Sequence, residues 1–390
     1  MNHNEGLKNS ILVDNDSVSN FYHILNPHGW SWSKITQLVP GSTDLRSRIG
    51  KFATPWEAPH DPLYQPPDLR YVDYDLFDII DHRALEVFDI AKKNNKKIAL
   101  LWSGGIDSTL VLTSFLKNLQ TADFENIEIV LNSDSLFENF DFYRNFISNK
   151  FKTHHLLDFE INNDTLNRYI VLHGDPGDCI FGPSLLAFWH LAREGKHTLP
   201  WKDYRHLIIS FFDDDESIHR VPRFGFWYVN KISKNLEEVK PDGVDTIADW
   251  WWWNYFNFKW TASIVRPFVR LRKDYSQPIS RKHQEDFANY TFFNTDKFQL
   301  WSYSNLKNHF RDVQKGSSNI KQEAKKYIFE FDRNELYTNK KTKMAGRGLD
   351  FERRILRVSP MYYDQNWIGH FGWEPGAMES AKEMLESFKG

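Results

Sequence analysis

The sequence predicts an α/β fold, with a doubly wound parallel sheet in residues 71–182 and a mainly helical, aromatic-rich region in residues 183–390. Two observations lead to this prediction. Short apolar runs alternate with stretches of helical periodicity, which is the pattern of β-α-β units. Turns that contain glycine and carboxylates follow two of these runs, and in such sheets ligands bind beyond the carboxyl ends of the strands.

The elements follow one another in a regular order. Residues 72–94 carry apolar side chains at the spacing of an amphipathic helix, and residues 98–102 form the short apolar run of a buried parallel strand. A helix is expected to begin near Asp107, because Leu110, Val111 and Phe115 recur at helical spacing. Beyond it we expect strands at residues 126–131, 154–159 and 169–172, with helices at residues 138–150 and 164–168.

Two later segments carry expectations of their own. Residues 206–212 form an apolar run that predicts a strand. Residues 249–260 are the most aromatic stretch of the chain. A helix buried on several faces, or an interface with a partner, explains that stretch better than base stacking does.

The composition narrows the class of protein. The chain has 390 residues, 41% hydrophobic and 26% charged, which predicts a globular protein of one large domain or a few smaller ones. The net charge of −3 argues against an extended nucleic-acid surface. A single cysteine, Cys179, excludes a disulfide framework and fits a reducing compartment. Neither a secretory signal nor an apolar stretch of membrane-spanning length is found, so we expect a cytoplasmic protein with no membrane partner.

Residues 1–70 differ from the rest of the chain in their many prolines and weak periodicity. Their tryptophans need burial, so we expect this region to pack on the main body formed by residues 71–390. The sequence gives no indication of its role.

The turn after residues 98–102 is the first candidate for a functional site. A strand, a glycine turn and a helix start place backbone N–H groups and the positive end of the helix dipole at one spot, which suits an anion. The alternative is an ordinary strand-to-helix turn capped by serine or aspartate. Asp107 adds a carboxylate that can hold Mg²⁺ beside bound phosphates. The candidate phosphate-binding residues are Ser103, Gly104, Gly105, Asp107, Ser108 and Thr109.

A second candidate follows the strand at residues 169–172, in the string Gly174-Asp175-Pro176-Gly177-Asp178. On its own this string predicts a turn. At the end of a strand in the same sheet, it brings two carboxylates to the edge that carries the first turn. Asp178 can then reach a metal held by Asp107, because Mg²⁺ needs only one or two carboxylates beside phosphates.

The polar segment at residues 132–135 follows the strand at residues 126–131. It lies at the same expected edge of the sheet. Two interpretations stand side by side: hydrogen bonds to the adenine or ribose of a nucleotide, or a simple polar loop.

The first string, Ser103-Gly-Gly-Ile-Asp-Ser108, resembles the signature of the PP-loop ATP pyrophosphatases. Those enzymes cleave ATP between the α- and β-phosphates and hold pyrophosphate in this loop. The second string is similar to the Gly-Glu-Gly-Ser/Ala-Asp-Glu-Leu-Phe-Gly-Gly motif of asparagine synthetase synthetase domains and of β-lactam synthetases. It departs from that motif at Asp175, Pro176 and Cys179, where the family has Glu, Gly and Glu. No Gly-x-x-x-x-Gly-Lys-Ser/Thr string occurs, so a P-loop that cleaves the γ-phosphate is not predicted.

The resemblance implies an enzyme that uses ATP and Mg²⁺ to adenylate a substrate carboxylate, releases pyrophosphate, and lets an amine displace AMP to form an amide. It implies that Gly174 lies at bound ATP and that Asp175 is the general base toward the amine. It also implies that Asp107 and Asp178 hold the metal.

A weaker match covers residues 320–344, which are similar to the family's Lys-x-x-Leu-Arg helix and the Arg-Pro-Lys-x-Gly-Phe string that follows it. The spacing matches Lys321 and Lys325 to the helix and Lys341 to the lysine of the second string. The resemblance implies that Lys341 is catalytic, contacting phosphate and stabilising developing charge. A solvated basic turn is the alternative.

Glutamine-dependent members of the family begin with a catalytic cysteine, ahead of a glutaminase domain. This chain begins Met1-Asn2-His3, and only about 70 residues precede the synthetase-like part. We therefore expect amide formation without glutamine hydrolysis by this chain. Its partners would be a small-molecule carboxylate and an amine, with ammonia supplied from solution or by a separate glutaminase.

Two other functions are compatible with the same residues. One is another PP-loop enzyme that modifies tRNA or another nucleic acid, although thiolating branches usually need paired cysteines and this chain has one. The other is a nucleotide-binding or structural protein that kept the fold without turnover. The departures at Asp175, Pro176 and Cys179 permit the latter.

Overall fold

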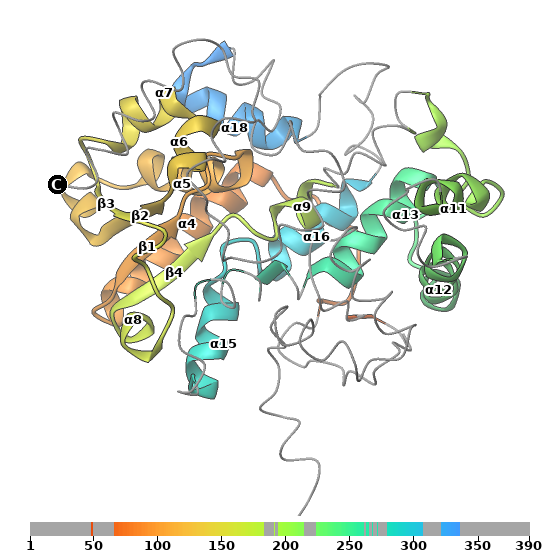
Figure 1. The fold of residues 1–390 in the computed structure, drawn as a ribbon, viewed down its shortest axis with the longest axis horizontal. Helices are drawn as coiled ribbons and strands as arrows, with labels where there is room; N and C mark the ends of the chain where they lie inside the picture. The colour runs from red at the N-terminus through yellow and green to blue at the C-terminus, as the bar shows by residue number, and fades with distance from the viewer. Residues whose placement is uncertain are drawn as a thin grey trace, which may run out of the picture.

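The fold is built on a four-stranded, all-parallel sheet with helices packed around it (Figure 1). The structure is a computed structural model, and it describes residues 48–49, 66–182, 191, 194–213, 224–260, 263–264, 267, 271, 279–306 and 321–335. The strands are β1 (Lys97–Leu101), β2 (Ile127–Leu131), β3 (Lys152–His155) and β4 (Tyr169–His173). An α/β fold with a parallel sheet, as the sequence predicts, is therefore confirmed.

Burial explains the composition of the inner strands. All five residues of β2 are buried, as are three of β1 and four of β4, because helices cover the sheet. Such strands need side chains that tolerate burial on both faces, and this makes them continuous apolar runs. The third strand differs. It lies at the sheet edge, its sequence is Lys-Thr-His-His, and none of its residues is fully buried. The strand predicted at residues 154–159 begins two residues and ends four residues later than β3.

The helices of the first half follow the predicted order. They are α4 (Leu76–Lys93), α5 (Ile106–Asn118), η2 (Thr121–Asn126), α6 (Ser133–Glu138), α7 (Phe140–Phe142), η3 (Tyr143–Ile147), α8 (Asn163–Arg168) and α9 (Gly177–Phe181). The single helix predicted at residues 138–150 is instead the short succession of α6, α7 and η3. The polar segment at residues 132–135 forms the start of α6, where the Asn132 side chain accepts a hydrogen bond from the amide of Ser135.

The strand order, β3-β2-β1-β4, places the two central loops side by side. From β1 the chain moves outward to β2 and β3, and then returns to β4 on the other side of β1. The order therefore reverses between β1 and β4, which is where ligands bind in open α/β sheets. Leu101, the last residue of β1, pairs with His173, the last residue of β4. The segments that follow these residues consequently start as neighbours.

The second half is helical. Its elements are η4 (Lys196–Thr198), α11 (Arg205–Asp213), α12 (Phe224–Val239), α13 (Ile247–Trp253), η5 (Asn254–Lys259), α15 (Arg281–Tyr290), α16 (Asp296–Ser304) and α18 (Gln322–Asp332). The strand predicted at residues 206–212 is wrong, because these residues form α11, which packs on α12. The spacing of Leu207, Ile208 and Phe211 suits a helix as well as a strand, so a short apolar run does not distinguish the two.

The aromatic stretch is a buried helix, which is one of the two interpretations that the sequence favours. Helix α13 continues into η5, and every residue from 247 to 260 is buried. Indole N–H groups buried there donate to polar side chains: Trp250 to Ser233, Trp252 to Ser302, Trp253 to Asn235 and Trp260 to Asn294. Base stacking is excluded for these rings as they stand, since they are inside the protein.

Two residues of the N-terminal region lie against this helix. The Arg48 guanidinium donates to the Phe256 carbonyl oxygen and to Gln299 Oε1, at 3.0 and 2.8 Å, and stacks over the Trp260 ring. The Ile49 amide donates to Asn257 Oδ1 at 2.8 Å. Within the described residues, no helix combines the length and the apolar character needed to cross a bilayer.

Glu128 joins the four strands at the end of the sheet where β1, β2 and β4 begin. It is 2% exposed on β2, and it accepts hydrogen bonds from Lys97 on β1 at 3.1 Å and from Tyr169 on β4 at 2.8 Å. On β3, His154 Nε2 lies 2.5 Å from Glu128 Oε2. Burial acts to raise the pKa of Glu128, but these donors outweigh it and lower the pKa to about 2.

We predict that Glu128→Gln lowers the free energy of unfolding by about 2 kcal/mol at pH 7, because charge-assisted hydrogen bonds are lost. The folded-state pKa is depressed, so the carboxylate stabilises the fold above the unfolded-state pKa of 4.5 and stops doing so as the pH falls toward about 2. The difference between variant and wild type should therefore shrink over that interval in urea denaturation. The exposed Glu125→Gln is the control, and an equal loss there would contradict the assignment.

Candidate functional site

The candidate site forms where the chain leaves β1 and β4. After β1, residues 102–105 turn into α5, and after β4, residues 174–176 turn into α9. The two turns touch through glycine. A Cβ on Gly174 would lie 2.5 Å from the Ser108 nitrogen, and a Cβ on Gly177 would lie 2.4 Å from Asp107 Cγ. Only glycine allows this approach, which presses the second turn against Asp107.

The first turn is held by its own serines. The Ser103 amide donates to Ser108 Oγ at 3.1 Å, and the Ser108 hydroxyl donates to the Gly105 carbonyl oxygen at 3.2 Å. Gly104 has a φ of +72° and packs so closely on α6 that a Cβ would lie 2.3 Å from the Ser135 oxygen. The N-cap of α5 is Gly105 and no side chain caps this helix, so the capping by serine or aspartate that the alternative expects is not found.

Thr109 does not lie where the sequence prediction puts it. Its side chain is fully buried, its hydroxyl accepts a hydrogen bond from Trp102 Nε1 at 3.2 Å, and its amide donates to the Gly105 carbonyl oxygen. These contacts place Thr109 in the core beneath the turn, not among the groups that face a ligand. The physical reason is the helical spacing, which turns position 109 toward the sheet.

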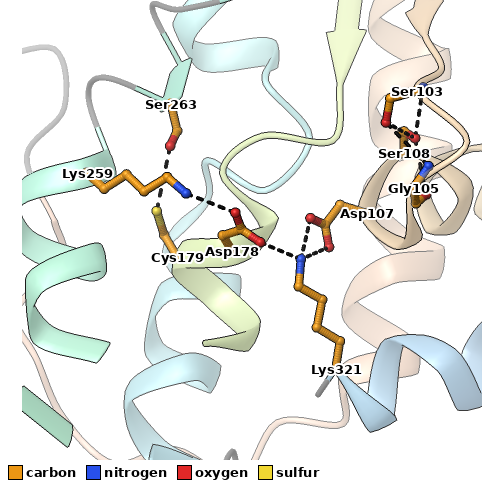
Figure 2. A network of polar contacts seen from close by, with 9 residues as sticks. All are labelled: Ser103, Gly105, Asp107, Ser108, Asp178, Cys179, Lys259, Ser263 and Lys321. Atoms are coloured by element: carbon orange, nitrogen blue, oxygen red, sulfur yellow. Dashed lines mark hydrogen bonds and ion pairs between the residues drawn. The ribbon is translucent and has the colours of Figure 1, made fainter. Parts of the chain in front are cut away.

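Asp107 and Asp178 converge on a single ammonium group (Figure 2). Lys321 Nζ lies 2.7 Å from Asp107 Oδ1, 2.5 Å from Asp107 Oδ2 and 2.6 Å from Asp178 Oδ1. A second lysine, Lys259, donates to Asp178 Oδ2 at 2.9 Å from the other side. The four side chains are between 6% and 20% exposed. Two carboxylates and two ammonium groups thus form a nearly buried, neutral cluster, which we call the ion cluster.

The environment moves the pKa values of the cluster in different directions. Burial raises the pKa of Asp107 to about 6, against the pull of Lys321 and with help from Asp178. Burial also favours the neutral form of Asp178, but Lys259 and Lys321 outweigh it and hold the pKa of that carboxyl well below its usual value. The two carboxylates likewise outweigh burial and raise the pKa of Lys321.

Helix α18 carries Lys321 to the ion cluster. The helix packs on α5, and the Tyr327 hydroxyl donates to Asp81 Oδ1 on α4. Lys117 Nζ of α5 lies 3.9 Å above the centre of the Tyr327 ring. These contacts anchor α18 one to two turns beyond Lys321, which is its N-cap residue. The backbone of Lys321 is thereby positioned by a helix that packs on α5.

The structure brings together most of the residues that the sequence singles out. Lys321 contacts both Asp107 and Asp178, and Gly174 packs against the backbone of Asp107. Asp175 is near enough for its negative charge to raise the pKa of Asp107. Lys325 is buried one turn along α18. The proposed catalytic residue Lys341 lies outside the described residues.

Sequence reasoning missed Lys259. It ends η5, its ammonium lies 4.3 Å from the centre of the Tyr255 ring, and it pairs with Asp178. One signal was available, since Lys259 is the only charged residue between Asp249 and Trp260 in the most aromatic stretch of the chain. A charge in a buried helix needs a partner of opposite charge.

The carboxylate pair has the chemistry of a Mg²⁺ site. The ammonium of Lys321 is a cation that both carboxylates reach at once, so a metal ion in that place would receive an oxygen from each. Mg²⁺ is commonly held by one or two carboxylates together with water and phosphate oxygens. Among the described residues no group of three or more His, Cys, Asp or Glu side chains is arranged for a metal, so further ligands would have to come from water or substrate.

Comparisons with known proteins add no family. No protein-family model, curated protein or solved structure matches the chain. The chemistry of the site therefore has to be argued from its own residues.

We predict that Gly177→Ala lowers the free energy of unfolding by about 2 kcal/mol, because its methyl group would overlap the Asp107 side chain and force the two turns apart. Gly105→Ala is the matched control, since its Cβ would meet only Ser103 Oγ at 3.3 Å. Chemical denaturation measures both. Equal losses for the two variants would show that the contact between Gly177 and Asp107 is not tight.

We also predict that Lys259→Met lowers the free energy of unfolding by about 3 kcal/mol, because it leaves Asp178 nearly buried with one cation in place of two. The control is Lys326→Met, which removes an exposed lysine paired with exposed Glu323. Exposed pairs contribute about 0–1 kcal/mol. If both variants unfold at the same denaturant concentration, Lys259 does not balance the charge of Asp178.

Proposed function

We propose that this protein is an AMP-forming, ATP-dependent carbon–nitrogen ligase of the PP-loop type, similar to the synthetase domain of asparagine synthetases. It adenylates a substrate carboxylate and transfers an amine to it. The observation that carries the proposal is the convergence of Asp107 and Asp178 on one cation. Each aspartate stands in the turn or helix start just after one of two adjacent parallel strands, at the reversal of strand order where open α/β sheets bind nucleotides.

The residues of the two turns divide the work of binding. The uncapped start of α5, after Ser103 and Gly105, offers backbone N–H groups and the positive end of a helix dipole to phosphate oxygens. Asp107 and Asp178 would hold Mg²⁺, which neutralises phosphate charge and polarises the phosphoryl group. Without a metal ion, Lys321 supplies the positive charge between the two carboxylates, which raise its pKa.

The proposed reaction has two displacements. A carboxylate oxygen of the substrate attacks the α-phosphorus of ATP, and the bond from that phosphorus to the bridging oxygen breaks, so that pyrophosphate leaves with its electrons. The amine nitrogen then attacks the activated carbonyl carbon, and AMP leaves to give the amide. Asp175 is the base that takes the proton which the amine loses.

The site also suits the electrostatics of such a reaction. The side chains of the ion cluster are at most 20% exposed, so their charges are screened weakly by water. A fixed cation placed where negative charge develops stabilises a transition state by on the order of 3 kcal/mol. Lys321 is a described residue that can take this role, and Lys341 is assigned the same role by family resemblance alone.

The same cluster favours one alternative. Lys321 and Lys259 already satisfy both carboxylates by hydrogen bonds, so the cluster can hold the fold together without any nucleotide. A protein that kept the architecture for binding or support, without turnover, would show the same contacts. The assay of turnover separates the two.

We predict that the protein catalyses exchange of pyrophosphate into ATP when one member of a panel of carboxylic acids is present, and that amide and AMP form when ammonium is added. Asp107→Asn and Asp178→Asn should each reduce exchange by about 100-fold or more, because a metal ligand is lost. The exposed Asp89→Asn on α4 should exchange at the wild-type rate.

Two outcomes would count against the proposal. Absence of exchange with every acid, together with measurable ATP binding, would favour the protein without turnover. Full activity of Asp107→Asn or Asp178→Asn would refute the metal assignment. Circular dichroism of each variant checks that the fold is retained.

A further inference from the structure

The ammonium of Lys321 lies at the one point that both aspartates reach. It contacts both oxygens of Asp107 and the inner oxygen of Asp178, while Lys259 occupies the outer oxygen of Asp178 (Figure 2). A divalent ion shared by the two carboxylates would have to occupy the position of the Lys321 ammonium group. Its bonds to the carboxylate oxygens are shorter than the distances from Lys321 Nζ to those oxygens. Lys321 and a shared metal ion therefore cannot be in place together.

The backbone of Lys321 is also unusual. Its φ and ψ are +58° and +36°, in the left-handed region that residues with a Cβ seldom occupy, and no side chain caps the helix that it starts. Such strain persists only when surrounding contacts impose it. Here the helix is anchored on one side by Tyr327 and Asp81, and the side chain is held on the other by the two carboxylates. Lys321 is thus held at both its backbone and its side chain, and only the contacts of its side chain involve the two carboxylates.

We infer that Lys321 is an internal substitute for the divalent cation: it keeps a bare metal ion out of the Asp107–Asp178 pair and gives up its place only when a polyphosphate arrives to accept its ammonium group. This inference rests on the metal site of the proposed function. It adds the order of events, since metal and polyphosphate must enter together.

The balance of charge in the ion cluster explains why metal and polyphosphate must enter together. The ion cluster holds two carboxylates and two ammonium groups, so its net charge is zero and a lone divalent cation meets no excess of negative charge. Displacing Lys321 without a new partner would leave an ammonium group, 7% exposed where it stands, without its carboxylates. The negative charge of a polyphosphate neutralises both the incoming divalent ion and the displaced ammonium group of Lys321. Metal and polyphosphate therefore strengthen each other's binding by the same factor.

The test measures binding of Mn²⁺ alone, by electron paramagnetic resonance, to the full chain without nucleotide. Lys321→Met should bind Mn²⁺ at least on the order of tenfold more tightly than wild type, because the carboxylate pair is then open and carries excess negative charge. Lys326→Met is the matched control, as this lysine lies on the same helix but pairs with exposed Glu323, and it should bind like wild type. Adding Asp178→Asn to Lys321→Met should remove the gain. Equal affinity of wild type and Lys321→Met would overturn the inference.

A second measurement uses the unaltered chain, in case Lys321→Met does not fold. The side-chain ¹⁵N resonance of Lys321, assigned with Lys321→Arg, should stay in place when Mg²⁺ is added alone and shift when Mg²⁺ and inorganic triphosphate are added together. A shift with Mg²⁺ alone, or no shift with both, would contradict the inference.

Neither arm needs adenylation. If Lys321→Met binds Mn²⁺ tightly but the wild type shows no ATP–pyrophosphate exchange, the proposed ligase function is refuted. The inference that Lys321 substitutes for the divalent cation then still stands. If the wild type shows ATP–pyrophosphate exchange but binds Mn²⁺ with the same affinity as Lys321→Met, the inference about Lys321 is refuted and the ligase function is supported.

Discussion

The ion cluster is the interaction on which the rest of the structure depends. It joins residues 107, 178, 259 and 321, which come from four separate segments of the chain. Charges this far from water are stable only when they are paired and hydrogen-bonded. Removing any one of the four would upset this balance of charge, so the loops after β1 and β4, the aromatic helix and α18 hold one another in position.

The sheet and the glycines make the cluster geometrically feasible. Parallel pairing of β1 with β4 starts the two turns side by side, and the absence of side chains at Gly174 and Gly177 lets them touch. Neither lysine comes from the sheet: Lys259 ends the aromatic helix, and Lys321 begins α18, which packs on α5. A rigid frame thus surrounds a pair of carboxylates whose distance from each other is set by backbone packing.

Local patterns in the sequence were enough for the features that depend on local physics. Buried strands appear as apolar runs, and glycine turns followed by carboxylates mark their ends, so β1, β2, β4 and the aspartates could be predicted. Edge strand β3 carries polar residues, so no apolar run marks its bounds. The apolar run of α11 suits a strand as well as a helix, so the sequence does not distinguish the two. Lys259 could not be assigned a partner, since Asp178 lies 81 residues away and only the fold brings them together.

Arg48 has a consequence for the order in which the chain folds. Its guanidinium is buried against Phe256, Trp260 and Gln299, and the contact with Phe256 spans 208 residues of sequence. Contacts of such high sequence separation close large loops and form late. During synthesis, Arg48 leaves the ribosome about 200 residues before Phe256, Trp260 and Gln299, the residues that it contacts. Arg48 and Ile49 therefore reach these contacts only after the helices of the second half have been made.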